Sequence, residues 1–220
     1  MRRLPKRASY DAETIYRILD AAFVCHVGYV LDGEPYVTPT AYWRENDHIY
    51  WHGSHASRML AAVGSGARVC VAVTHLDGLV AARSAFHHSL TYRSVMLFGR
   101  PHRIDDSDAK RAALNAFIER LYPGRVADIR PPTLTELQAT TVVAMTIAEA
   151  SAKVRSGPPL DDKDDYALPV WAGVIPVETR VAAPVADPRL KQSTLLPAYL
   201  RRLVKNGLGV PRTQTRRKHR

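Results

Sequence analysis

The chain has 220 residues, of which 46% are hydrophobic and 24% charged, and this composition is typical of one folded soluble domain with an appendage. No apolar run approaches the ~20 residues that a membrane-spanning helix needs, and no apolar segment follows the basic N-terminus, so we expect a cytoplasmic protein. The net charge of +10 lies entirely in residues 180–220, because residues 1–179 carry equal numbers of acidic and basic side chains. The charge therefore says nothing about the partners of the folded part.

Short helical and strand patterns alternate along the first two thirds of the chain. Asp11 is a candidate N-cap, and Asp32-Gly33 is a strong hairpin signal between two apolar runs. Gly99 and Pro101 indicate a bulge or an edge break in the longest run. In chain order we expect a helix over 12–22, strands over 23–30, 35–43 and 48–52, a helix over 57–63, strands over 68–75, 79–84 and 92–104, helices over 105–121 and 133–139, and a last strand over 141–147 whose track continues through 150–154.

These elements predict a mainly β fold, a β-barrel of about six antiparallel strands with helical crossovers, over residues 1–155. Residues 156–188 are rich in proline and are expected to form an arm that packs on the barrel. Residues 189–220 are expected to form a flexible basic tail with one short helix over 196–204 and a disordered end over 212–220. Nucleic acid or an anionic surface would bind only through this tail; the alternative is a tail that is merely solvated.

The first candidate site spans residues 49–60, where a strand ends, small polar residues turn the chain and a helix begins. Backbone N–H groups at the helix start, the Ser57 hydroxyl and the Arg58 guanidinium would converge there, and such donors suit a dianionic phosphate. The same spacing also fits a capped turn followed by a solvated arginine.

The second candidate site spans residues 87–95, where polar side chains gather just before a long strand. They would reach a ligand lying along the barrel, although an exposed hydrogen-bonding loop would have the same composition. Several histidines also fall between strands, but no HExxH, CxxC or HxH pattern organises them, so we expect no metal site. Cys25 and Cys70 lie in apolar runs and are expected to be buried reduced thiols.

The order of three stretches resembles a known family: residues 33–39 (GEPYVTP), residues 49–55 (IYWHGSH) and residues 92–99 (YRSVMLFG). Residues 149–153 (EASAK) fit the same pattern. Together they resemble the pyridoxamine 5′-phosphate oxidase-like, FMN-binding split-barrel proteins, and most nearly the branch of the nitroimidazole-resistance (Nim) proteins. The resemblance covers about residues 8–178 and implies a homodimer with flavin at the subunit interface.

The resemblance also implies which residues contact the flavin, with Ser57 and Arg58 at the phosphate. Oxidases of the family follow that arginine with a lysine, whereas this chain has Met59. His52 is the candidate catalytic or flavin-tuning residue. The full set of implied cofactor-binding residues is Val37, Thr38, Pro39 and Thr40 beneath the ring, Trp51, His52 and Gly53 beside it, Ser57, Arg58 and Met59 at the phosphate, and Ser89, Tyr92, Arg93 and Ser94, expected from the partner subunit.

By this resemblance the protein is an FMN-dependent oxidoreductase acting on a small molecule, either nitroreductase-like or oxidase-like, with FAD as the alternative to FMN. Two other functions stay open: a flavin-binding or redox-sensing module without turnover, and the same barrel binding heme or a deazaflavin. Vitamin B6 oxidation is not expected, because Trp171 lacks the nearby arginine of the true oxidases and the next one is Arg180.

Overall fold

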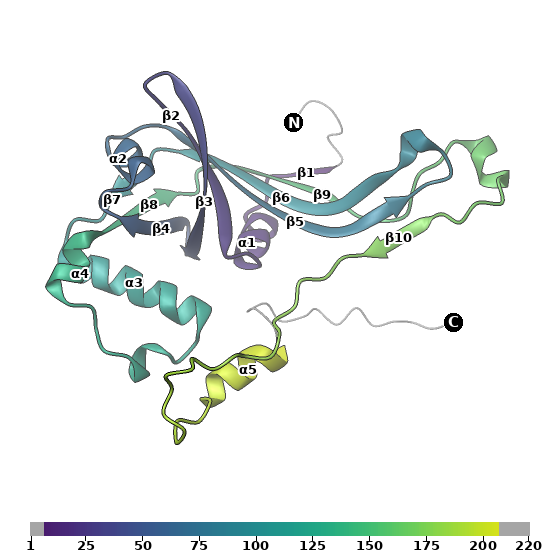
Figure 1. The fold of residues 1–220 in the computed structure, drawn as a ribbon. Coiled ribbons are helices and arrows are strands. Elements are labelled where there is room, and N and C mark those ends of the chain that lie inside the picture. Colours follow the sequence, from purple (N-terminus) through teal and green to yellow (C-terminus); the bar gives the residue numbers. More distant parts are fainter. Residues whose placement is uncertain (1–6, 207–220) are drawn as a thin grey trace.

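An antiparallel sheet that curls on itself without closing organises residues 7–206, the part of the chain that the computed structural model describes (Figure 1). Its strands follow the order β1-β9-β6-β5-β2-β3-β4-β8-β7, and β10 pairs with β5 beside this path. The strands are β1 (Ala8–Ser9), β2 (Val24–Leu31), β3 (Glu34–Glu45), β4 (His48–Ser54), β5 (Val69–Ala81), β6 (Ser89–Gly99), β7 (His102–Arg103), β8 (Thr140–Thr146), β9 (Glu149–Arg155) and β10 (Gly173–Pro176).

The predicted mainly antiparallel β fold is thus confirmed, although the described sheet has ten strands rather than about six. Three of the extra strands, β1, β7 and β10, have two to four residues and carry little pattern, and β9 is a separate strand where a continuation of β8 was expected. The helices are α1 (Ala12–Asp20), α2 (Arg58–Gly64), α3 (Ser107–Leu121), α4 (Leu134–Ala139) and α5 (Ala198–Asn206), with 3₁₀ turns η2 (Ala85–His87), η3 (Val126–Asp128) and η4 (Lys163–Ala167). Among residues 7–206, no helix is long and apolar enough to cross a bilayer.

Side-chain caps fix where the helices begin. Asp11 accepts the Thr14 N–H at 2.8 Å to start α1, whose buried stripe is Ile15, Ile18 and Leu19. Thr133 and Glu136 form a complete capping box at α4. These are local signals, so the helices begin within a residue or two of where the sequence predicts them.

The two faces of the β2–β5–β6 sheet differ sharply. The inner face carries the main core, with Val27, Val71 and Val95 almost fully buried beneath α1 and α2. The outer face holds the alternate residues of the same strands, His26, Cys70 and Met96. Of these, His26 and Met96 are exposed and Cys70 is half-buried. A second, smaller core lies under α3.

Two strand predictions need correction. The runs 68–75 and 79–84 form one strand, β5, because Asp77 is accommodated as a bulge between Leu76 and Gly78 rather than as a turn. The residues after β8 do not continue its track: β9 leaves β8 and pairs with β6 along its length. The strand expected over 92–104 does break near Pro101, as Gly99 and Pro101 predict, and its end forms the separate β7.

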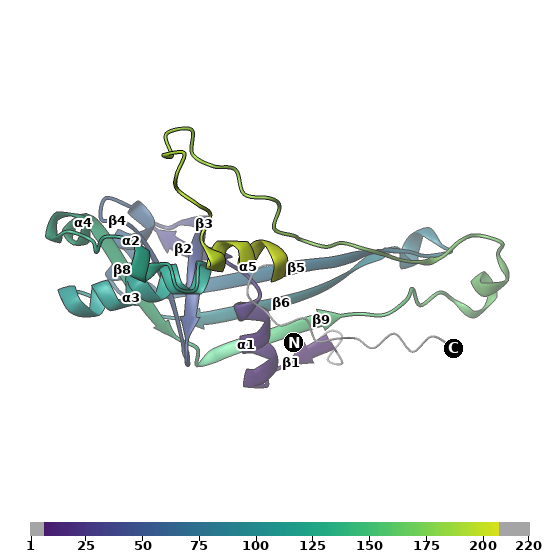
Figure 2. The same ribbon diagram turned by 90° about the horizontal axis from the view of Figure 1, so that it is seen from below.

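A long arm projects from the barrel (Figures 1 and 2). It consists of the β5–η2–β6 hairpin beyond His75 together with residues 158–176, which return along it and add β10 to β5. Asp161 fastens the two parts, because its carboxylate accepts from the Arg83 backbone N–H at 3.0 Å and from Arg83 Nη1 at 2.9 Å. The Arg83 guanidinium also lies over the Tyr166 ring.

The C-terminal segment reaches back to the α3 side of the barrel. There Tyr199 of α5 donates its hydroxyl to Asp128 at 2.7 Å and accepts from Arg125 at 2.9 Å. The short helix expected over 196–204 is therefore present, shifted by two residues. The disorder expected for 212–220 concerns residues outside the described part.

Candidate functional site

The β4–α2 junction places two of the expected phosphate ligands at the surface. Ser57 is the N-cap of α2, and its Oγ accepts the Leu60 N–H at 3.4 Å. Arg58 begins the helix and is exposed, with its guanidinium 4.7 Å from the centre of the Tyr36 ring. Met59 turns inward and is only 5% exposed. Arg58 has no carboxylate partner among residues 7–206, so its charge is available to an anionic ligand.

Next to this junction the sheet splits open. β3 pairs with β4 only where Tyr42–Glu45 face His48–Trp51. Beyond that point β3 continues beside β2, and β4 continues beside β8. The edges of β3 near Thr40 and of β4 near Gly53 that face each other have no strand partner in the described chain. Their backbone N–H and C=O groups are free to bond a ligand.

The residues expected beneath the ring divide between two faces of β3, because side chains alternate along a strand. Thr38 and Thr40 share the inner face with Val27 and Cys25, their partners in β2. Val37 and Pro39 lie on the outer face, where Val37 is 69% exposed. A ring lying flat on one face of β3 would therefore touch only half of this set.

β4 shows the same division. Trp51 is fully buried in the main core, and a Cβ on Gly53 would lie 3.1 Å from Leu60 Cδ1, which keeps the chain close to α2. His52 points to the other side, where its ring lies 4.8 Å from that of Phe117 and 5.9 Å from that of Trp43. Its Nδ1 is buried without a hydrogen-bond partner. The structure thus does not bring the His52 side chain to the same face as Ser57 and Arg58, and its role stays a prediction.

Burial of His52 has a consequence for stability. It lowers the pKa of the imidazole below the ordinary value of 6.5, because the charged form loses solvation. Protonation then favours the unfolded chain, so the stability that the neutral ring contributes is complete above about pH 6.5 and is lost as pH falls through the lower folded pKa. We expect His52→Leu to flatten the acid side of the stability curve in urea unfolding between pH 7 and 5.

The exposed His55 provides the matched control for that experiment, since His55→Leu removes a histidine from the next turn. The stability of His55→Leu should fall with pH at the same slope as that of the wild type. Equal slopes for all three proteins would contradict the buried, neutral state of His52. His52→Leu should keep the part of the slope that comes from His75, whose pKa burial also lowers.

The expected partner-facing residues of β6 also separate. Tyr92 and Ser94 lie on the outer face, where Lys153 Nζ sits 5.5 Å from the Tyr92 ring centre. Arg93 lies on the inner face and forms two 2.8 Å hydrogen bonds with the bulge residue Asp77. Ser89 lies at the far end of β6, within the arm. Arg93 is therefore already neutralised, whereas Lys153 has no carboxylate partner in the described residues.

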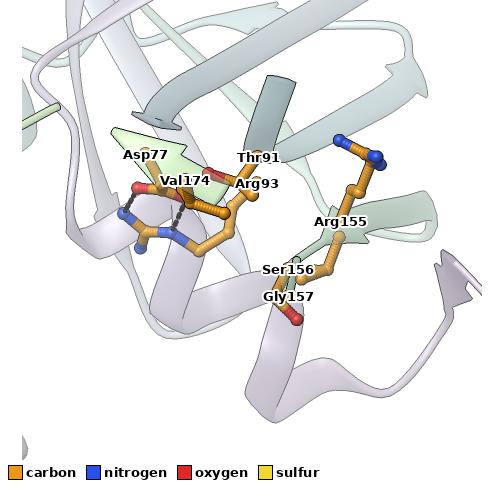
Figure 3. Close-up of a pocket in the computed structure, with 8 residues that line it drawn as sticks. Asp77, Thr91, Arg93, Arg155, Ser156, Gly157 and Val174 are labelled. Carbon is orange, nitrogen blue, oxygen red and sulfur yellow. Dashed lines mark hydrogen bonds and ion pairs between the residues drawn. The ribbon is translucent and has the colours of Figure 1, made fainter. Parts of the chain in front are cut away.

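A hollow of about 330 Å³ opens beside the Arg93–Asp77 pair (Figure 3). Figure 3 shows the side chain of Arg155 directed away from that pair, and its Nη1 donates to the Leu90 carbonyl at 2.7 Å. The lining residues are Asp77, Thr91, Arg93, Val154, Arg155, Ser156, Gly157 and Val174.

Sequence reasoning passed over Tyr36, Asp77 and Arg155. Asp77-Gly78 resembles a turn, and nothing local shows that Tyr36 lies under Arg58 or that Arg155 reaches Leu90. Among residues 7–206, no group of three or more His, Cys, Asp or Glu side chains is arranged to hold a metal ion.

The family model for pyridoxamine 5′-phosphate oxidase matches residues 11–154, which run from the cap of α1 almost to the end of β9. The chain belongs to this family. The resemblance seen in the sequence motifs is thereby confirmed at the level of the family. The arm residues 158–176 and α5 lie beyond the matched part of this oxidase-family chain.

Two solved structures are similar to the chain over nearly its whole length. The flavocytochrome Anf3 from Azotobacter vinelandii is 46% identical, with a TM-score of 0.88, over 92% of this chain and 94% of that one. The FAD and heme binding protein from Mycobacterium smegmatis is 40% identical, with a TM-score of 0.86, over 89% of this chain and 96% of that one.

A structure described as a candidate 5-nitroimidazole antibiotic resistance protein, from Bacteroides thetaiotaomicron, is 24% identical over 67% of this chain and 86% of that one, with a TM-score of 0.56. At that identity it shows the shared fold alone. Among curated proteins, the comparison finds no match.

Proposed function

We propose that this oxidase-family chain is a flavin- and heme-binding redox protein. The observation that carries the proposal is the similarity, at 46% and 40% identity over about nine tenths of the chain, to a flavocytochrome and to a protein that binds FAD and heme. The sequence motifs alone favour flavin and leave heme as an alternative. The two long similarities make both cofactors part of one proposal.

The β4–α2 junction fits a flavin. Arg58 supplies an exposed guanidinium that no described carboxylate neutralises, and the Tyr36 ring supports it from below. The split between β3 and β4 offers free backbone groups to a polar ring edge. We propose FAD as the flavin, as in the M. smegmatis protein, and a finding of FMN would restore the prediction from the motifs.

The outer face fits a second copy of the chain. Several apolar side chains of β2, β3 and β6 are exposed on this face, and exposed apolar surface of this kind favours an interaction site. We propose that two copies pack through it, with the flavin at the interface. The exposed residues are Val24, Val30, Val37, Met96 and Phe98.

When bound, the flavin exchanges hydride or single electrons and the heme exchanges single electrons, which together supply the redox chemistry. The chain's own task is to bind, orient and shield these groups. Arg58 holds phosphate, the strand split positions the ring, and the buried Met59 and Trp51 keep the junction rigid. The small-molecule substrate and the cytoplasmic location stay predictions from the sequence.

Sedimentation of the purified full-length protein, loaded with flavin and hemin and then desalted, tests the proposal in one experiment. Absorbance at the protein, flavin and Soret bands should sediment together at the mass of two chains. Cofactor released by acid is then identified by chromatography as FAD or FMN. Absence of a flavin band after loading with either flavin would overturn flavin binding, absence of a Soret band would overturn heme binding, and the mass of one chain would overturn the dimer.

A further inference from the structure

The outer face of the sheet continues onto the arm as an apolar surface, because Leu90 alternates along β6 with the inner residue Thr91 and so shares the outer face with Tyr92 and Ser94. Leu79 of β5 lies opposite Leu90 of β6 on one side and Ile175 of β10 on the other, so the three side chains share a face. All three are more than 40% exposed. Phe86, in the turn at the tip, is 88% exposed. A flat apolar ligand such as a porphyrin would cover such a surface.

A heme iron needs an imidazole with one nitrogen free and the other held by a hydrogen bond that sets the ring's orientation. Of the histidines in residues 7–206, two have Nδ1 on a backbone carbonyl and no partner at Nε2: His88 on Ser84 at 2.9 Å and His55 on Ala139 at 3.4 Å. A carbonyl accepts only, so Nδ1 must carry the proton and Nε2 the lone pair.

The remaining described histidines are less suited. His48 is engaged at both nitrogens, by Asp47 and Thr146, and His75 uses Nε2 on the Ile18 carbonyl. His52 is packed under α3. His87 Nε2 is buried 3.3 Å from the Asp162 carboxylate, and His26 and His102 are exposed without a hydrogen bond to fix the ring.

The surroundings separate His88 from His55. His88 lies in the arm, between the exposed Phe86 and the exposed Leu90, whereas His55 is flanked by small residues, Ser54 and Ala56. The Leu90 carbonyl also accepts from Arg155, which has no carboxylate partner in the described chain. Burial, and then the nearby charge of Arg7, lower the pKa of the Arg155 guanidinium. An anion bound beside Arg155 would therefore stabilise its charged form.

We propose that His88 is the axial ligand of the heme and that Arg155 pairs with a heme propionate. The proposal rests on the heme part of the proposed function and adds the place, the arm, and the residues. It requires the free Nε2 of His88, the apolar face around Leu79 and Leu90, and the uncompensated charge of Arg155. The flavin junction at Arg58 lies on a different part of the fold, near α2.

The test compares full-length wild type, His88→Gly and the matched control His55→Gly, each titrated with hemin and read by absorbance and by electron paramagnetic resonance. We expect His88→Gly to bind hemin about tenfold more weakly or worse and to lose the wild-type ligand-field signature. Flavin content should stay at the wild-type level, which shows that the variant folds. Added imidazole should restore the wild-type spectrum to His88→Gly, because it replaces the missing ligand.

The control variant and the wild type distinguish a wrong assignment of His88 from an absence of heme binding. If wild type takes up heme and His88→Gly shows the same spectrum and affinity, or if His55→Gly is the variant that loses them, the assignment of His88 is wrong while heme binding stands. If wild type itself shows no Soret band after loading, the heme function and the assignment both fail. Arg155→Ala should weaken hemin binding without changing the ligand-field signature, and a changed signature would contradict its assigned role.

Discussion

Replacing Arg58 with alanine is expected to weaken flavin binding roughly 30- to 150-fold, since a charge-assisted pair of hydrogen bonds to phosphate contributes about 2–3 kcal/mol. The structure gives this arginine no competing carboxylate within residues 7–206 and seats it on the Tyr36 ring. Met59, where the oxidases have lysine, is buried and cannot compensate. Fluorescence titration of the apoprotein with FAD and with FMN measures the change.

Arg17→Ala is the matched control, because Arg17 is likewise exposed on a helix and donates only to Thr14. It should bind flavin like wild type. Arg58→Lys keeps the charge but loses the forked geometry, so it should fall between wild type and alanine. If Arg58→Ala binds both flavins as tightly as wild type, the phosphate lies elsewhere and the junction is a capped turn, the other reading that the spacing allows.

Local signals explain why so much of the fold is readable from the sequence. Asp11 and Thr133 cap helices where the pattern places them. Asp32 and Gly33 both adopt positive φ, 53° and 84°, which the hairpin turn demands and which these two residue types tolerate. In each case the determining contacts lie within four residues of one another, so no knowledge of the tertiary fold is needed.

The errors share a different cause, which is that distant contacts decide the outcome. Asp77 would end a strand by its type, but its carboxylate binds Arg93 of the neighbouring strand, and β5 continues past it as a bulge. β9 could extend the track of β8, yet it pairs with β6, which is some fifty residues earlier in the chain. Alternation places His52 and Trp51 on opposite faces of β4. Only the packing of Phe117 from α3 against His52 shows which of the two faces lies under α3.

The same reasoning applies to the candidate site. Ser57 and Arg58 could be predicted as a pair because one helix start brings both of them forward. The arm could not be predicted, because its strands β5, β6 and β10 come from three separate stretches and residues 156–172 carry no regular strand pattern. Its apolar face and the anchored His88 become visible only when the three strands are assembled.

Gly78→Ala is expected to loosen β10 from the arm. A Cβ at this position would lie 2.9 Å from the Ile175 carbonyl oxygen and 2.9 Å from Val174 Cγ1, as well as 2.8 Å from Thr91 Oγ1. A backbone oxygen cannot turn aside as a side chain can, so β10 must move or β5 must bend. Overpacking of this kind destabilises by about 1–3 kcal/mol, which predicts amide hydrogen exchange in residues 173–176 faster by about 5- to 150-fold.

Gly28→Ala is the matched control within the same sheet. Its added Cβ would meet the Cys70 carbonyl oxygen at 3.5 Å, an ordinary contact, so exchange in residues 173–176 should stay as in wild type. Flavin binding should survive Gly78→Ala, because Arg58 lies at the β4–α2 junction and β10 contacts β5 in the arm. Heme binding should weaken, since Ile175 contributes to the apolar face beside Leu79. Unchanged exchange in Gly78→Ala would mean that close approach of the two strands does not hold β10 in place.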